Sequence, residues 1–164
     1  MGSEALILGG RSGVGKTTVA LEMHAQLTAN DVSHCVIDGD FLDMAHPLPW
    51  AHKLAEQNLT AMWRNYRALG YRRLIYINSA SVLPDVTDEL IAAMGDSPTV
   101  CAALLTCSGA IATQRLSQRE GTATKLGAVP AGWPPSELLI HLSRTALARM
   151  ALPSSTLART PRER

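Results

Sequence analysis

The sequence has no marked excess of one charge and no long apolar run, and each shortage excludes a broad class of protein. Lysine and arginine number 15 against 14 aspartates and glutamates, which gives a formal net charge of +1. A chain this close to neutrality has no overall field to recruit nucleic acid or a membrane surface, so we expect neither as a partner. No apolar run reaches the roughly 18 residues that a membrane-spanning helix needs. No basic segment precedes the first apolar stretch as in a signal peptide, and we therefore expect a cytoplasmic location.

Cysteine is also scarce. The chain has three cysteines, Cys35, Cys101 and Cys107, and each lies in or beside an apolar run. They lack the short paired spacing of a zinc site. Buried free thiols, which a reducing cytosol maintains, are the simpler interpretation.

The chain does contain a regular alternation of short apolar runs and helical patterns. Its length of 164 residues, with 46% apolar and 18% charged residues, suits one domain with a hydrophobic core. We assign that domain to residues 1–152 and a polar tail to 153–164. The apolar runs predict strands at 5–8, 35–37, 74–77 and 99–106. The patterns between and after them predict helices at 16–29, 51–69, 85–94, 110–120 and 136–150.

This order of elements predicts the fold class. Strands that alternate with helices favour a three-layer α/β/α fold around a parallel sheet, here of four to five strands. Ligands of such sheets bind at the carboxyl ends of the strands. In the first helix, Val19, Ala20, Met23 and Leu27 share one face, which we expect to be buried.

A phosphate-binding motif joins the first strand to the first helix. The pattern G-x-x-x-x-G-K-[ST] is matched by Gly10, Arg11, Ser12, Gly13, Val14, Gly15, Lys16 and Thr17. Glycines let consecutive backbone N–H groups approach phosphate oxygens, and the helix that follows presents its positive dipole end. We expect Lys16 to reach the β- and γ-phosphates and the Thr17 hydroxyl to bind Mg²⁺. Thr18 is either a supporting contact or an ordinary helix residue.

An acidic turn, Asp38-Gly39-Asp40, follows the second strand. At a strand end beside the phosphate-binding loop, one carboxylate can accept a proton from a substrate hydroxyl, and one can hold a Mg²⁺ water. We assign Asp40 as the base and Asp38 as a metal or substrate contact. The alternative is a turn that uses Asp and Gly only for conformational reasons.

Together, the loop at Gly10–Thr17 and the acidic turn at 38–40 resemble the P-loop small-molecule kinases, in particular the adenylylsulfate kinase and gluconate kinase branch. The resemblance covers roughly residues 4–150 and implies the P-loop NTPase fold. In that branch an acidic turn after the second strand meets the acceptor. The resemblance further implies ATP as donor, Mg²⁺ as cofactor and a small molecule with a hydroxyl group as acceptor.

Two arginines precede a glycine- and proline-rich segment at 121–135. Arg115 and Arg119 lie four residues apart on one helix face. The resemblance implies a lid here, at about 120–135, whose arginines stabilise the charge on the transferring phosphoryl group. Lys125 is a further lid residue on this interpretation. The alternative is a solvated charged face in which Gln118 or Glu120 is the partner.

The residues at 41–67 are expected to form the wall opposite the phosphate-binding loop. Side chains that suit an acceptor pocket are Phe41, His46, Trp50, His52, Asn58, Trp63 and Arg64, although a core position suits Trp63 better. The third strand ends in Asn78-Ser79 without an acidic residue, which argues against a motor or switch NTPase. No feature of the sequence identifies the acceptor.

Beyond residue 150 the sequence shows no pattern of a fifth strand. An uncovered fourth strand invites dimerisation through its edge. The absence of a fifth strand also leaves open a second function, a nucleotide-binding regulatory or assembly module with slow hydrolysis or none. A nucleic-acid end kinase is disfavoured because the chain is nearly neutral, and binding a phosphate backbone needs a basic track.

Overall fold

The computed structural model describes residues 2–120, and their side chains as far as residue 117. Residues 121–135 of the predicted lid at 120–135, the helix at 136–150 and the tail at 153–164 lie outside the described residues, as does Lys125. No helix within the described residues is both long and apolar enough to cross a membrane.

Four parallel strands form one sheet in the order β2-β3-β1-β4. The strands are β1 (Glu4–Gly9), β2 (Cys35–Asp38), β3 (Arg73–Ile77) and β4 (Thr99–Leu104). The predicted α/β class is therefore confirmed. The last strand ends two residues earlier than predicted.

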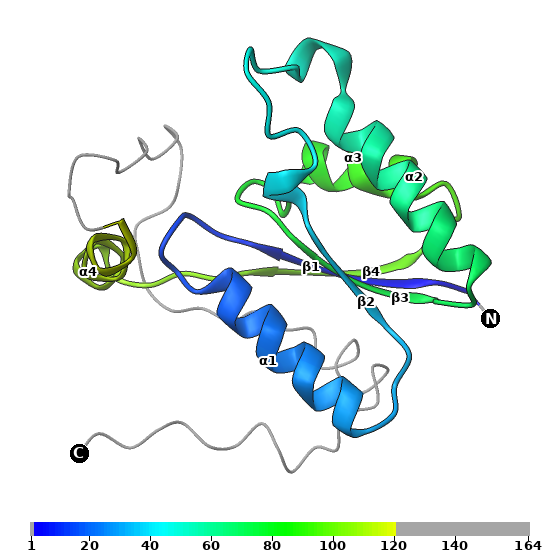
Figure 1. The fold of residues 1–164 in the computed structure, drawn as a ribbon, viewed down its shortest axis with the longest axis horizontal. Coiled ribbons are helices and arrows are strands. Elements are labelled where there is room, and N and C mark those ends of the chain that lie inside the picture. Colours follow the sequence, from blue (N-terminus) through cyan, green and yellow to red (C-terminus); the bar gives the residue numbers. More distant parts are fainter. Residues whose placement is uncertain (1, 121–164) are drawn as a thin grey trace.

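Helices cover both faces of this sheet (Figure 1). They are α1 (Lys16–Ala29), α2 (Leu54–Ala68) and α3 (Pro84–Met94), while α4 (Gly109–Glu120) lies beyond the carboxyl end of β4. The chain moves from β1 to β2 in one direction across the sheet, and from β2 to β3 and β3 to β4 in the other. Because such crossovers are right-handed, α1 packs on one face while α2 and α3 pack on the other. The second helix starts at Leu54 because a 3-10 turn occupies Trp50–His52 and Lys53 adopts a left-handed backbone conformation.

Strand β1 contributes side chains alternately to two cores. Ala5 and Ile7 pack with α2 and α3, whereas Leu6 and Leu8 pack with α1. Helix α1 buries Ala20 and Leu27, with Met23 packed alongside. The prediction for Val19 was wrong: its side chain is 36% exposed, since the buried row of α1 runs through Lys16, Ala20 and Leu27 and passes beside it.

The three cysteines are free thiols. Cys35 is buried, as expected, and burial raises the pKa of its thiol to about 12. Cys101 and Cys107 are only partly buried. A pKa this high keeps the Cys35 thiol protonated and unreactive at neutral pH.

The topology places a crevice at the carboxyl ends of β1 and β3. These strands are neighbours, but the chain leaves β1 over one face of the sheet through α1 and leaves β3 over the other through α3. The connections diverge and leave a gap between the two strand ends, which is where open α/β sheets bind ligands. Residues 10–15 follow β1 at this edge and residues 78–80 follow β3.

Candidate functional site

The loop between β1 and α1 is curled by glycines in left-handed conformations. Gly10, Gly13 and Gly15 have φ values of 143°, 84° and 102°. At Gly10 a side chain would also overlap the carbonyl oxygen of Leu105. The curvature needs glycine at these positions and leaves the loop backbone at the carboxyl edge of the sheet.

The loop leads into a helix start that suits an anion. No described side chain caps the α1 N-terminus at Gly15, and its first turn contains no acidic residue. The first N–H groups of a helix have no intrahelical partner, and its dipole is positive at this end. Thr17 and Thr18 are both exposed in this turn. The arrangement can bind phosphate oxygens through backbone N–H groups.

Lys16 lies inside the loop and is only 8% exposed. Its Nζ donates to the Gly10 carbonyl oxygen at 2.6 Å and to Ser79 Oγ at 3.3 Å. Burial lowers the pKa of Lys16, while the charges of Asp40 and Asp38 act in the opposite direction. The ammonium group is thus held where the phosphate-binding loop meets the acidic turn.

Asp40 lies across from Lys16 and is held by the residues that follow β3. Its Oδ1 accepts from Asn78 Nδ2 at 2.9 Å, and its carboxylate also accepts from the Ser79 N–H. Although the residue remains open to solvent, the surrounding protein partly desolvates its carboxyl group. This desolvation raises the pKa of Asp40, against the lowering effect of Lys16. A carboxylate with a raised pKa is a stronger proton acceptor.

Asp38 has a conformational contact in the same turn. Its Oδ1 accepts from the Asp40 N–H at 3.1 Å and caps the 3-10 turn Gly39–Phe41. Gly39 is required for a reason other than backbone freedom, because the Tyr76 hydroxyl lies where a Cβ would be. Asp38 and Gly39 thus have conformational roles in the turn, and a metal or substrate contact at Asp38 stays a prediction.

Sequence reasoning missed the part played by Asn78 and Ser79. The Asn78 amide is oriented by the Ala80 N–H, which donates to its Oδ1 at 2.9 Å, so that its Nδ2 faces Asp40. Ser79 touches both sides of the crevice: its Oγ accepts from Lys16, its N–H donates to Asp40, and its carbonyl accepts from the Gly10 N–H. The signal in the sequence is the position of both residues directly after the third predicted strand, where ligand-binding residues of such sheets lie.

Helix α4 packs against the phosphate-binding loop. Arg115 Nη1 donates to the Val14 carbonyl oxygen at 3.2 Å. A Cβ at Gly13 would lie only 2.8 Å from the Ala112 carbonyl oxygen. On the same side, Arg11 Nη2 donates to the Cys107 carbonyl at 3.3 Å. The structure therefore brings Arg115 to the loop, whereas Arg119 lies one turn further along α4 and its side chain is outside the described residues.

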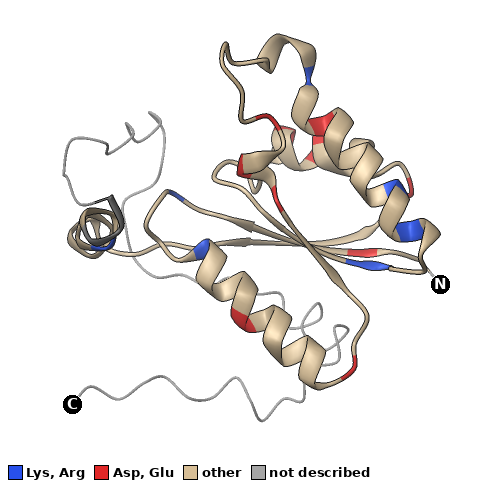
Figure 2. Cartoon of the chain, in the orientation of Figure 1, with Lys and Arg blue, Asp and Glu red and all other residues tan. Residues whose placement is uncertain are grey.

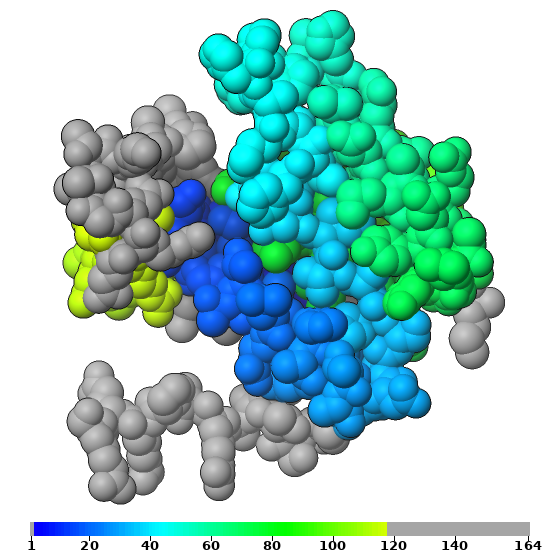
Figure 3. Space-filling view, viewed as in Figure 1, coloured from blue at the N-terminus to red at the C-terminus, as the bar shows by residue number. Residues whose placement is uncertain are grey.

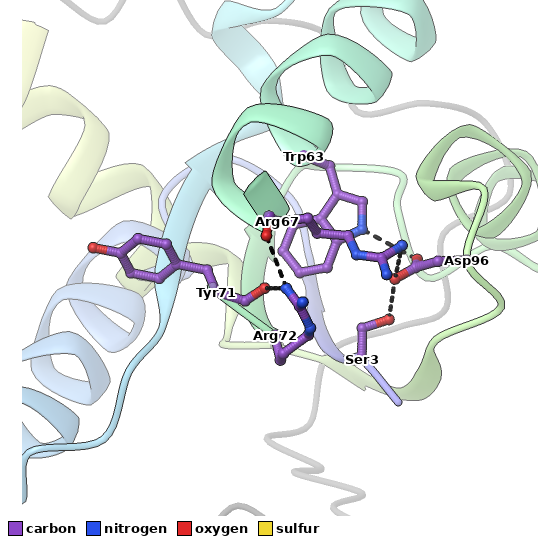
Figure 4. Close-up of polar contacts among 6 residues, drawn as sticks. All are labelled: Ser3, Trp63, Arg67, Tyr71, Arg72 and Asp96. Atoms are coloured by element: carbon purple, nitrogen blue, oxygen red, sulfur yellow. Dashed lines mark hydrogen bonds and ion pairs between the residues drawn. The ribbon is translucent and has the colours of Figure 1, made fainter. Parts of the chain in front are cut away.

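The residues expected in the acceptor wall separate into three groups. Trp63 is in the core at 1% exposure, and its Nε1 donates to Asp96 at 3.1 Å in a polar network with Ser3 and Arg67 (Figure 4). Asn58 Nδ2 donates to the Leu42 carbonyl at 2.6 Å and anchors the connection that follows β2. The remaining residues are exposed: Phe41, His46, Trp50, His52 and Arg64.

The fold is shared with solved kinases. No protein-family model matches this chain, and no curated protein matches it. The APS kinase CysC of Mycobacterium tuberculosis, solved with AMPPNP and APS, superposes with a TM-score of 0.56 at 16% identity, over 90% of this chain and 93% of that one. A structure from the PezAT toxin–antitoxin system of Streptococcus pneumoniae gives 0.51 at 22% identity, over 72% of this chain and 52% of that one. At these identities the similarity establishes the fold alone, which this chain shares with the APS kinase.

Proposed function

We propose that this protein is an ATP-dependent kinase that transfers the γ-phosphoryl group to a hydroxyl of a small molecule. The observation that carries the proposal is the meeting of Lys16 and Asp40 across Ser79, at the crevice that the topology creates. A cation for the phosphates and a base for the acceptor lie on opposite sides of one gap. The superposition on an APS kinase that was solved with AMPPNP supports a nucleotide in this place.

The donor half would work by positioning and charge. Backbone N–H groups of the loop and of the first turn of α1 bind the phosphate oxygens, and Lys16 exchanges its carbonyl partners for those oxygens. Magnesium takes few protein ligands and keeps several waters. The exposed Thr17 hydroxyl fits such an ion, although the described residues contain no cluster of three metal-binding side chains. Bound there with ATP, Mg²⁺ would neutralise part of the phosphate charge.

The acceptor half would supply the base. Asp40 takes the proton of the acceptor hydroxyl. The hydroxyl oxygen forms a bond to the γ-phosphorus, and the bond from that phosphorus to the bridging oxygen of ADP breaks. Asn78 and the Ser79 N–H keep the carboxylate oriented. Lys16 stabilises the charge on the transferring group, and Arg115 and Arg119 are the residues we propose to assist from α4.

A nucleotide-binding module without transfer is the second proposal, because Asn78-Ser79, with no acidic residue, follows β3. Incubation with labelled ATP and a panel of alcohols distinguishes the two. The kinase proposal expects label in at least one alcohol and its loss in the Asp40→Asn variant. Tight binding of Mg·ATP, label only in free phosphate, and equal ATP affinity in Asp40→Asn would favour the module.

A further inference from the structure

The acceptor side of the crevice is acidic while the donor side is basic. Asp38, Asp40 and Asp43 lie within six residues, and both Asp38 and Asp43 act on Asp40 as like charges. Figure 2 shows acidic residues at the end of β2 and in the connection that follows it, and basic residues in the phosphate-binding loop and at the start of α1. Residues 39–52 contain no lysine or arginine.

The nearest basic residue along the chain is already paired. Lys53 Nζ forms an ion pair with Glu89 Oε1 at 2.8 Å. An acceptor that carries phosphate or sulfate would therefore meet carboxylates on this connection, with no lysine or arginine there to balance them. Like charges at short range disfavour the binding of such an acceptor.

The same connection exposes large apolar side chains. Phe41 and Met44 are each 68% exposed, Leu48 is 58% exposed and Trp50 is 70% exposed. These four are among only nine large hydrophobic side chains that are exposed in the described residues. These four fall within ten consecutive residues, and large apolar side chains exposed so close together in the chain suit a binding surface.

The connection is fixed to the crevice at its beginning. Leu42 is buried in the core at 7% exposure, and its carbonyl accepts from Asn58. Leu42, two residues after Asp40, is thus a fixed point of the connection, and the exposed residues lie on either side of it. In Figure 3 the surface is hollowed between the dark-blue residues of the loop and the cyan residues of this connection.

We propose, on the basis of the kinase function above, that the acceptor is an alcohol with an apolar or aromatic body and without an anionic group. Its body would lie against Phe41, Met44, Leu48 and Trp50, with its hydroxyl at Asp40. The aromatic rings offer broad apolar faces to such a body. A sugar, which needs many hydrogen bonds, would find no hydrogen-bond partner on Phe41, Met44 and Leu48 themselves.

The test compares alcohols that share one hydroxyl environment. The panel contains neutral aryl-alkyl alcohols, a hexose, and the phosphate or sulfate monoesters of aryl-alkyl diols, which retain one free hydroxyl. Label transfer from ATP gives kcat/KM for each. We expect the neutral aryl-alkyl alcohols to exceed their charged counterparts by about tenfold or more, which corresponds to a modest difference in binding. Equal or better transfer to the charged esters, or to the hexose, would overturn the acceptor class.

The variant Trp50→Ser tests the surface itself. It should raise KM for the aryl-alkyl alcohols about tenfold with little change in kcat. Leu69→Ser is the matched control, since Leu69 is 77% exposed at the end of α2, and it should change neither constant. Unchanged KM in Trp50→Ser, for instance because another segment of the chain covers the surface, would count against the proposal.

A binding measurement separates this proposal from the kinase function. Titration calorimetry of the aryl-alkyl alcohols in the presence of AMPPNP needs no transfer. Binding that Trp50→Ser weakens, without any labelled product, would retain the class of ligand bound at this surface and reject the kinase. Transfer only to sugars or anionic esters would retain the kinase and reject the acceptor class.

Discussion

The two halves of the crevice are built in different ways. The donor half is one continuous stretch, in which three glycines curl the backbone and Lys16 is buried among carbonyl oxygens. The acceptor half combines the end of β2, the end of β3 and an exposed connection. A triphosphate has the same shape in every enzyme that uses it, so one local motif suffices to bind it. An acceptor differs between enzymes, and its side of the site is assembled from separate elements.

The largest expected effect divides the two halves. Asp40→Asn removes the proposed base but keeps an oxygen that can accept from Asn78, so the turn should stay in place. We expect kcat to fall by about 10²–10⁴-fold while the affinity for Mg·ATP changes little. Steady-state kinetics and calorimetry measure the two quantities. Asp43→Asn, in the same connection, is the control and should retain most of kcat. Loss of ATP affinity in Asp40→Asn would mean that the halves are not separable.

Lys16→Ala tests the donor half. This substitution removes the ammonium that we expect on the phosphates, and kcat should fall by about 10²–10³-fold. In contrast to Asp40→Asn, the affinity for ATP should fall as well. Lys53→Ala, which alters an exposed lysine outside the loop, serves as the control. Normal ATP binding and turnover in Lys16→Ala would contradict the assignment of the loop.

Gly39→Ala tests whether β3 supports the acidic turn. The new Cβ would overlap the Tyr76 hydroxyl, and overpacking of this kind costs about 1–3 kcal/mol in the free energy of unfolding. Urea denaturation measures this cost. Tyr76→Phe in the same chain should recover part of it, because the hydroxyl oxygen is removed. Gly2→Ala, where a Cβ would have no neighbour within 4 Å, is the matched control.

The smallest effect concerns pH. Because desolvation raises the pKa of Asp40, kcat/KM should rise with pH through a midpoint above the ordinary carboxyl range. Asn78 donates to the ionised carboxylate and favours it. Asn78→Ala should therefore move the midpoint to higher pH, because one hydrogen bond to the ionised form is lost. A midpoint that stays in place or moves to lower pH would exclude Asn78 as a positioning residue. Asn65→Ala, on the exposed side of α2, is the control.

Local patterns predicted most of the fold. Helix α1 has the predicted bounds, and all four predicted strands exist, because each depends on a short apolar run or a glycine-led helix start. The start of α2 was placed three residues early because a 3-10 turn at Trp50–His52 continues the helical pattern without forming the helix. Val19 was misplaced because helical spacing fixes a face only to within about one residue, or about 100°.

The candidate site was only partly predictable, for a different reason. Lys16 and Asp40 follow from motifs that are contiguous in the sequence. The contact between Asp40 and Asn78 joins residues 38 positions apart, and it depends on β2 and β3 being neighbours in the sheet. The Tyr76 hydroxyl beneath Gly39 is likewise a consequence of register. No local pattern encodes such pairs, so the positioning residues emerged only once the strands were in order.

The way the connection after β2 is tied has a consequence for how this protein can change over evolutionary time. Leu42 is fixed by the core and by Asn58, and Lys53 is tied to Glu89 on α3. The residues between these two ties carry the exposed side chains and take no part in holding Asp40. Insertions and substitutions there leave the base and the phosphate-binding loop untouched. On the proposed kinase function, changes within this one loop would alter the acceptor while the proposed base and the phosphate-binding loop stay the same.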